Sequence, residues 1–419
     1  MRNASRIFFL LIVSCGLALA QSQYKVIYNF HGLDGASPRT VILDPSGNLY
    51  GTTLSGGNKT YECSNGCGTV FKLSPNQDGT WSETVLYAFC NIGMLCRDGY
   101  EPTSLTMDAK GNLYGTTYFG GASCCGEIYE LSPSQDGTWT FNILYSFCSL
   151  DSCPDGENPS GALAIDAAGN LYGATVSGGN NFNGVVFKLS PPSLPGGTWT
   201  ESVVYDFCSD IQNQACLDGF DPRGGVTLDS SGNLIGTTFV GGQYLKGCGG
   251  EGCGTVFKLS PSSGAWAYTQ LDATLASVGF GPVSPVVTDS AGNVYGTFEL
   301  GGGKGNGALF KISPNGQHSS QPLSAAENGY PQAALVLGNT AIYGSTLGTG
   351  SNKPGTIFQI TSTGQSILHK FCSAKNCADG TSPLGLVSNS SGVLYGVAEA
   401  GGTGCSGGGG CGVVYMLKP

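Results

Sequence analysis

One short motif recurs seven times along the chain. Gly-Asn-Leu-Tyr-Gly-Thr-Thr at 111–117 is one copy. The copies end at Gly51, Gly115, Gly173, Gly236, Gly296, Gly344 and Gly396, so that consecutive copies lie 48 to 64 residues apart. A recurring unit of this size predicts an array of one supersecondary element, not a set of independent domains.

Each unit contains four short segments with the composition of β-strands. In one unit they are residues 105–108, 113–119, 127–131 and 139–147, separated by turn residues and without helical periodicity. Four-stranded antiparallel units repeated radially predict an all-β fold, a seven-bladed β-propeller. A β-solenoid is the alternative architecture, but its coils are usually shorter than these units.

The two ends of the chain complement each other. Residues 24–30 match a fourth strand such as 85–89, whereas 412–417 match a third strand that no fourth strand follows. Pairing the two segments would complete the last blade and remove two exposed strand edges. We therefore predict that the N-terminal strand closes the ring by joining the C-terminal blade.

The first twenty residues have the features of an export signal. Arg2 and Arg6 precede an apolar run at 7–13, and small residues at 18–20 form a cleavage site. The run is too short to span a bilayer. We predict that residues 1–20 are a signal peptide and that the chain is exported to an extracellular, periplasmic or cell-envelope location.

Cys15 offers a different outcome of export. It ends a sequence that fits the lipobox of bacterial lipoproteins, so lipidation at Cys15 is the alternative to cleavage after Ala20. In either case residues 21–419 are predicted to form a single propeller domain, because one closed β-architecture can exceed the usual domain size.

The charge of the chain argues against two classes of partner. Without Arg2 and Arg6, 16 basic and 28 acidic residues remain, a net charge of −12. Such a surface repels nucleic-acid phosphates and anionic lipid, so we expect no nucleic-acid partner. No apolar run is long enough for a membrane span.

Sixteen cysteines remain besides Cys15, and they fall into eight local pairs. Four pairs follow a fourth strand: Cys90/Cys96, Cys148/Cys153, Cys208/Cys216 and Cys372/Cys377. Four lie between a second and a third strand: Cys63/Cys67, Cys124/Cys125, Cys248/Cys253 and Cys405/Cys411. Units that lack one member lack both, which predicts disulfides in an exported chain.

Two features complicate this interpretation of the cysteines. Zinc binding is the alternative, but the spacings are irregular and matching histidines are missing. Cys124 and Cys125 are adjacent, so they can bond only through a strained eight-membered ring; they can also pair elsewhere or be redox-labile.

The cysteine pairs are expected to share one face of the disc. In an antiparallel four-stranded blade, the loop between the second and third strands and the connection to the next blade lie on the same side. We call this side the stapled-loop face. Long, stapled loops on a rigid scaffold are where a binding surface is usually presented, so we predict that recognition occurs there.

The connection between blades carries an Asp-Gly-x-x-Pro motif. Its aspartates are Asp34, Asp98, Asp155, Asp218 and Asp379. Five equivalent carboxylates could surround the channel mouth and bind a structural cation or sugar hydroxyls. The alternative is that each organises a turn before the inner strand, as a residue shared by repeats usually does. We likewise interpret Asp44, Asp108, Asp166, Asp229 and Asp289 as turn caps.

Catalytic motifs are sparse. The three histidines, His31, His318 and His369, lie in different units, and the chain has no Gly-x-Ser-x-Gly elbow or phosphate loop. We predict no cofactor and no metal centre. We favour a non-enzymatic binding or scaffolding protein that recognises a glycan or a cell-surface partner on the stapled-loop face. The alternative is a carbohydrate-active hydrolase or lyase with carboxylates near the central channel.

The repeat pattern G-N-L-Y-G-T-T…G-G…G-x-V-F-K-L-S-P…L-Y-x-F resembles the GloVer tandem-repeat family of exported bacterial proteins. The resemblance covers the chain from Tyr24 to Pro419. It implies a propeller-like fold and no settled activity. Many members carry a C-terminal sorting segment and are linked with a choice of anchors. Here Lys418 and Pro419 directly follow the last strand, so C-terminal anchoring is not expected, and Cys15 is the only sequence-visible anchor.

Overall fold

The computed structural model describes most of residues 22–419. The described residues are 22–93, 95–194, 196–212, 215–243, 248, 250–273, 279–302, 305–323, 329–348, 354–405 and 410–419. The predicted signal peptide and Cys15 lie outside them. No helix within the described residues has the length and apolar character needed to cross a membrane.

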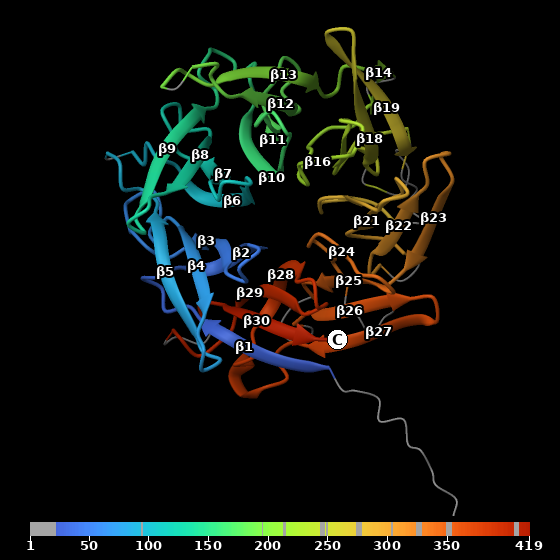
Figure 1. The fold of residues 1–419 in the computed structure, drawn as a ribbon. Coiled ribbons are helices and arrows are strands. Elements are labelled where there is room, and N and C mark those ends of the chain that lie inside the picture. Colours follow the sequence, from blue (N-terminus) through green and yellow to red (C-terminus); the bar gives the residue numbers. More distant parts are fainter. Residues whose placement is uncertain are drawn as a thin grey trace, which may run out of the picture.

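Seven four-stranded antiparallel sheets form a ring, as predicted from the repeat (Figure 1). Blade 1 contains β2 (Ala36–Leu43), β3 (Leu49–Ser55), β4 (Thr69–Pro75) and β5 (Trp81–Ala88). Blade 2 contains β6 (Tyr100–Met107), β7 (Leu113–Phe119), β8 (Glu127–Pro133) and β9 (Trp139–Ser146). Blade 3 contains β10 (Glu157–Ile165), β11 (Leu171–Ser177), β12 (Val185–Ser190) and β13 (Thr200–Asp206).

The remaining blades follow the same order from the inside outwards. Blade 4 contains β16 (Val226–Leu228), β17 (Leu234–Thr238), β18 (Thr255–Ser262) and β19 (Ala265–Ala273). Blade 5 contains β20 (Val287–Thr288), β21 (Val294–Phe298), β22 (Ala308–Ile312) and β23 (His318–Pro322). Blade 6 contains β24 (Val336–Leu337), β25 (Ala341–Thr346), β26 (Thr356–Thr361) and β27 (Gly364–Lys370). A small hairpin of β14 (Ile211–Gln212) and β15 (Ala215–Cys216) precedes blade 4.

Blade 7 joins the two ends of the chain. It contains β28 (Thr381–Ser388), β29 (Leu394–Ala400), β30 (Val413–Lys418) and, outermost, β1 (Gln23–Asn29). In the antiparallel register Tyr24 pairs with Leu417 and Val26 with Tyr415. Figure 1 shows the N-terminal strand lying along the C-terminal blade. The predicted closure of the ring is confirmed.

The last glycine of the repeated motif is required by packing within each blade. A Cβ atom on Gly51 would lie 2.3 Å from the Thr40 carbonyl oxygen and 2.5 Å from the Phe71 ring. Phe71, from the third strand, is fully buried. Because the aromatic ring of the third strand lies across the second strand, only a residue without a side chain fits there.

The aspartates before Gly-Asn are turn caps, as predicted. The Asp44 carboxylate accepts the backbone N–H groups of Ser46 and Asn48 at 2.8 Å each, and the Asn48 side-chain amide at 2.7 Å. Asp108, Asp166, Asp229 and Asp289 make the same hydrogen bonds. These five carboxylates therefore organise hairpins on the face opposite the stapled loops.

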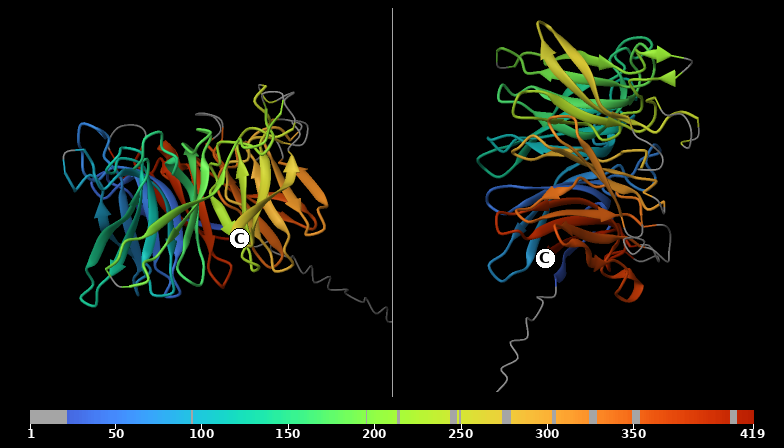
Figure 2. Two further views of the ribbon diagram at one scale, coloured as in Figure 1. Left: turned by 90° about the horizontal axis from the view of Figure 1, so that it is seen from above. Right: turned by 90° about the vertical axis from the view of Figure 1, so that its right-hand side faces the viewer.

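A tryptophan at the start of a fourth strand packs across four of the interfaces between blades. Each indole lies edge-on against a tyrosine of the preceding blade, with ring centroids 6.0 to 6.2 Å apart. The pairs are Trp81/Tyr395, Trp139/Tyr50, Trp199/Tyr114 and Trp266/Tyr172. These aromatic contacts pack neighbouring sheets of the ring against each other; Figure 2 shows the ring turned by 90°.

Tyr24→Ala is expected to lower the free energy of unfolding by about 3 kcal/mol, the typical cost of truncating a buried aromatic ring. Tyr24 stacks on His369 with ring centroids 3.6 Å apart and contacts Phe371 and Tyr415. The matched control is Lys25→Ala, on the exposed side of the same strand, with an expected effect within about 0.5 kcal/mol. Urea unfolding measures both, and equal effects would contradict closure by β1.

Candidate functional site

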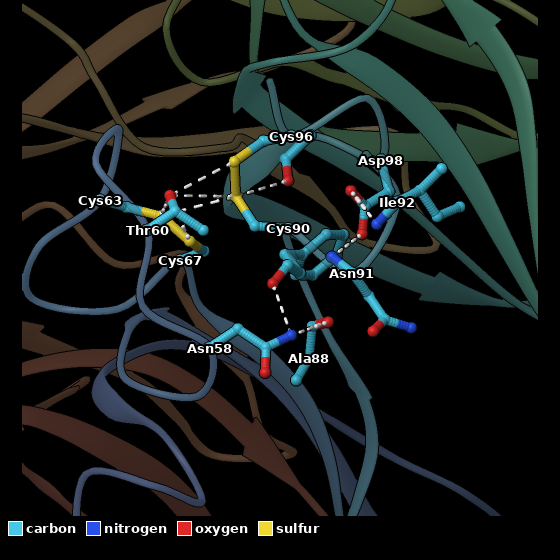
Figure 3. Close-up of a disulfide and its surroundings, with 12 residues drawn as sticks. Asn58, Thr60, Cys63, Cys67, Ala88, Cys90, Asn91, Ile92, Cys96 and Asp98 are labelled. Atoms are coloured by element: carbon cyan, nitrogen blue, oxygen red, sulfur yellow. Dashed lines mark hydrogen bonds between the residues drawn. A yellow bond between two sulfur atoms is a disulfide. The ribbon is translucent and has the colours of Figure 1, made fainter. Parts of the chain in front are cut away.

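Seven of the eight predicted cysteine pairs are disulfide-bonded. They are Cys63–Cys67, Cys90–Cys96, Cys148–Cys153, Cys208–Cys216, Cys248–Cys253, Cys372–Cys377 and Cys405–Cys411. Figure 3 shows two disulfides of blade 1 side by side, with Cys63 Sγ 3.5 Å from Cys90 Sγ. The two kinds of loop therefore meet on one face, as predicted. The four sulfur atoms lie within 4.8 Å of one another, but as disulfides they offer no thiolate to a metal.

Cys124 and Cys125, the eighth candidate pair, are not bonded. Their Sγ atoms are 3.5 Å apart and both are free thiols. The physical reason is the strain of the eight-membered ring that adjacent cysteines would form. Cys125 Sγ lies within 4.8 Å of the Cys148–Cys153 sulfurs and of Glu157. Burial, with added contributions from Cys124 and Glu157, raises the pKa of the Cys125 thiol to about 12.

The aspartates of the connecting motif hold their own loops in shape. Asp98 is fully buried; it accepts the Tyr87 hydroxyl at 2.7 Å and the backbone N–H groups of Asn91 and Ile92 at 2.8 and 3.1 Å. Asp34, Asp155, Asp218 and Asp379 also bind their own loop or the preceding strand. Four of the five are buried, all but Asp34. These contacts are the ones expected if each aspartate organises the turn before an inner strand.

The residue before the proline of each connecting segment has a left-handed backbone in all seven blades. These residues are Ser37, Glu101, Asn158, Asp221, Gly281, Tyr330 and Ser382, with φ between 54° and 65°. The N–H of Glu101 donates to the Cys67 carbonyl at 3.0 Å, which ties blade 2 to the stapled loop of blade 1. Non-glycine residues adopt this conformation rarely, and such residues concentrate at functional sites.

Charged and aromatic side chains of several blades lie near one another beside these positions. We define the axial cluster as Arg39, Glu101, Tyr118, Asp221, Arg223, Phe239, Glu299 and Glu399. Burial raises the pKa of Tyr118 in blade 2, and the charge of Asp221 beside blade 4 adds to this effect. Because blade 3 lies between those blades, the two side chains can approach each other only near the axis.

Ion pairs hold the two arginines of the axial cluster. Arg39 of blade 1 contacts Glu399 of blade 7 at 3.1 Å. Arg223 binds Asp221 through Nη2 at 2.6 Å and through Nε at 2.9 and 3.0 Å. The Arg223 guanidinium also lies 4.1 Å from the centre of the Phe239 ring. Both guanidinium groups are thus held in place by ion pairs with carboxylates.

Burial changes the acidity of two glutamates in the axial cluster. It raises the pKa of Glu101, and the charge of Arg39 opposes this rise. Burial also raises the pKa of Glu299, offset by a 2.8 Å hydrogen bond from Gln332 and by the charge of Arg223. These carboxyl groups therefore keep a proton more readily than free glutamates do.

The sequence analysis did not identify the axial cluster. It considered the residues that all repeats share, whereas Glu101, Asp221, Arg39 and Arg223 occupy positions that vary between repeats. The sequence did contain a signal for this cluster. The polar residues at these positions differ between repeats, whereas the neighbouring Gly and Pro of the connecting motif are mostly constant. The three histidines lie away from the inner strands: His31 follows β1, His318 is in β23 and His369 is in β27.

Comparisons with known proteins identify the repeat and the fold. A family profile described as Gloeobacter/Verrucomicrobia repeat matches residues 15–249 and 245–419. A virginiamycin B lyase variant from Staphylococcus aureus, solved with quinupristin, superposes with a TM-score of 0.55 at 14% identity, covering 95% of this chain and 100% of that chain. A likeness at this identity shows the fold alone.

Two further solved structures are similar at lower scores. A gluconolactonase from Xanthomonas campestris has a TM-score of 0.44 at 10% identity, covering 95% of this chain and 90% of its own. A PQQ-bound aldose sugar dehydrogenase from Streptomyces coelicolor has a TM-score of 0.43 at 12% identity, covering 95% and 98%. No curated protein matches the chain.

A buried acid lies close to Asp98 beneath the stapled loops. Glu127 is fully buried at the start of β8, where blades 1, 4 and 6 have Thr69, Thr255 and Thr356. Its Oε1 atom accepts a hydrogen bond from the Ser146 hydroxyl at 2.9 Å, whereas its Oε2 atom has no hydrogen-bond partner among the residues that the structure describes. Burial raises the pKa of Glu127 to about 8.

Glu127 is expected to make the stability of the protein decrease as pH rises. Its folded pKa exceeds the ordinary value of 4.5, so the folded protein keeps a proton that the unfolded chain releases. The contribution of Glu127 to stability should be fully present below about pH 4.5, fall as pH rises towards about pH 8 and then level off. Between about pH 5 and about pH 9 the free energy of unfolding should therefore decrease by an amount on the order of 3–4 kcal/mol because of Glu127. In Glu127→Gln this decrease should be absent, and urea unfolding of both proteins at the two pH values measures it. An unchanged pH dependence would exclude the buried acid as its source.

Two thiols per mature chain are expected to react when the denatured, unreduced protein is titrated with a thiol reagent. They should belong to Cys124 and Cys125, because the other fourteen mature-chain cysteines are in disulfides. The double variant Cys124→Ser/Cys125→Ser should show none. A wild-type chain without reactive thiols would mean that the adjacent pair is oxidised.

Proposed function

The chain belongs to the Gloeobacter/Verrucomicrobia repeat family, and from this premise we propose that it is an exported, non-enzymatic binding protein whose axial cluster recognises a neutral glycan. The observation that supports this most is the convergence of side chains from several blades on the stapled-loop face. Seven disulfides indicate an oxidising compartment outside the cytoplasm. Among such locations, we propose the cell envelope or the exterior.

The chemistry of the axial cluster suits sugar hydroxyls. Two arginines and four carboxylic acids give it a formal charge of −2 when all are ionised. A cluster that combines guanidinium donors with carboxylate acceptors offers hydrogen bonds of both kinds to an uncharged, polyhydroxylated ligand. Arg39 and Arg223 are already held by ion pairs, so little side-chain freedom is lost on binding.

One observation favours a second function, a carbohydrate-active hydrolase or lyase. Glu101 and Glu299 have raised pKa values in the same cluster, and a general acid needs such a carboxyl group. The arrangement differs from that of a histidine-dependent site, since His31, His318 and His369 lie on outer strands or directly after one. Turnover of a polysaccharide would distinguish this function from binding.

A glycan array and a polysaccharide-degradation assay on the mature chain test the proposal. We expect stable retention of a neutral glycan without product release. Arg223→Ala should weaken retention at least tenfold, since hydrogen bonds to a charged group are typically worth about 1.5–3 kcal/mol. The matched control is Arg97→Ala, an exposed arginine on a loop of the same face outside the axial cluster.

Two results would contradict this function. Repeated release of cleaved product would favour the enzymatic alternative, and loss of that activity in Glu101→Gln or Glu299→Gln would assign its acid. Retention that is equal in Arg223→Ala and Arg97→Ala would place recognition elsewhere on the molecule. Thermal unfolding of each variant shows whether the fold is intact.

A further inference from the structure

The interface between blades 5 and 6 has the tyrosine but lacks the tryptophan that is present at four other interfaces. Tyr295 of β21 stands at the position of Tyr50, and its hydroxyl donates to Asp289 at 3.0 Å. In blade 1, Pro75 pairs with Trp81; the corresponding positions of blade 6 are Ser362 and Thr363, in the short turn between β26 and β27. No indole is therefore available from blade 6 to cover Tyr295.

A cavity lies where that indole would pack. Its volume is about 890 Å³, and its lining includes Tyr295, Lys311, Gln321, Asn339, Ile342 and Ile360. Three of the four tyrosines that contact a tryptophan, Tyr50, Tyr114 and Tyr172, are 5–6% exposed, whereas Tyr295, like Tyr395, is only partly buried. The cavity is within the usual range for small-ligand sites, and it has both apolar walls and polar groups.

The surroundings of Tyr295 otherwise match those of two covered tyrosines, Tyr50 and Tyr172. The Lys311 ammonium lies 5.4 Å from the Tyr295 ring centre, compared with 5.6 Å for Lys72 over Tyr50 and 5.9 Å for Lys188 over Tyr172. The hydroxyl is held by an aspartate in the same way as in Tyr172. The side of the Tyr295 ring that corresponds to the indole-contacting side of Tyr50 and Tyr172 therefore has similar neighbours, but no indole of the chain packs against it.

We infer that this cavity, named here the blade 5/6 groove, binds a small planar aromatic compound of about the size of indole. Edge-on packing against Tyr295 and contact with Ile342 and Ile360 supply the affinity. Lys311, Gln321 and Asn339 provide hydrogen bonds at the rim. The groove lies beside the β20–β21 hairpin, on the face opposite the stapled loops, so this site is separate from the proposed glycan site.

Titration of the mature chain with indole, followed by calorimetry or ligand-observed NMR, tests the inference. A nine-atom ligand in a preformed site should bind saturably with a dissociation constant of roughly 0.1–1 mM. Thr363→Trp places an indole at the position corresponding to Trp81 and should weaken binding at least tenfold. Tyr295→Ala should do the same by removing the ring against which indole packs.

The matched control is Thr138→Trp, the same substitution on an exposed hairpin whose neighbouring Trp139 already covers Tyr50. It should leave indole binding unchanged. Should Tyr295→Ala fail to fold, Thr363→Trp decides the question alone. Absence of saturable binding, or binding that Thr363→Trp leaves intact, would overturn the inference. Glycan retention should be unaffected by Thr363→Trp, so failure of this site and failure of the proposed function are distinguishable.

Discussion

Pairing of β1 with β30 is the interaction on which the rest of the structure depends. It completes blade 7 with a strand that lies almost 400 residues from its partner and covers an edge that would otherwise be exposed. Backbone hydrogen bonds and the burial of Tyr24 against Phe371 and Tyr415 stabilise it. Because the ring is closed, all inner strands point to one axis, and side chains of non-adjacent blades meet there.

The two faces of the ring differ because their loops obey different constraints. Hairpins on one face are short and capped by aspartates such as Asp44. On the other face, disulfides and buried carboxylates such as Asp98 fix longer connections, which hold the left-handed residues before each proline. The stapled-loop face therefore has a rigid framework, and the residues that differ between blades can change without loss of the fold.

Departures from the repeat coincide with both proposed sites. Constant positions, such as Gly51 and Phe71, satisfy packing needs that every blade shares. Glu101 and Arg223 occupy positions without a shared packing role. At the blade 5/6 groove, blade 6 lacks the tryptophan that other repeats have at the start of the fourth strand, and Tyr295 lines a cavity. Irregularities in a repeat are therefore the places where binding can evolve at little cost to stability.

The sequence by itself determined the number of blades, the closing strand, the turn caps and seven disulfide pairs. These features rest on local turn chemistry, strand patterning and short-range pairing, which adjacent residues specify. Only the tertiary structure brought Arg39 to Glu399 and Tyr118 near Arg223, buried Asp98 and Glu127, left Cys124 and Cys125 unbonded and opened the groove beside Tyr295. The physical reason is that convergence and burial depend on how seven blades are inclined around one axis, a property of the closed ring that no single repeat contains.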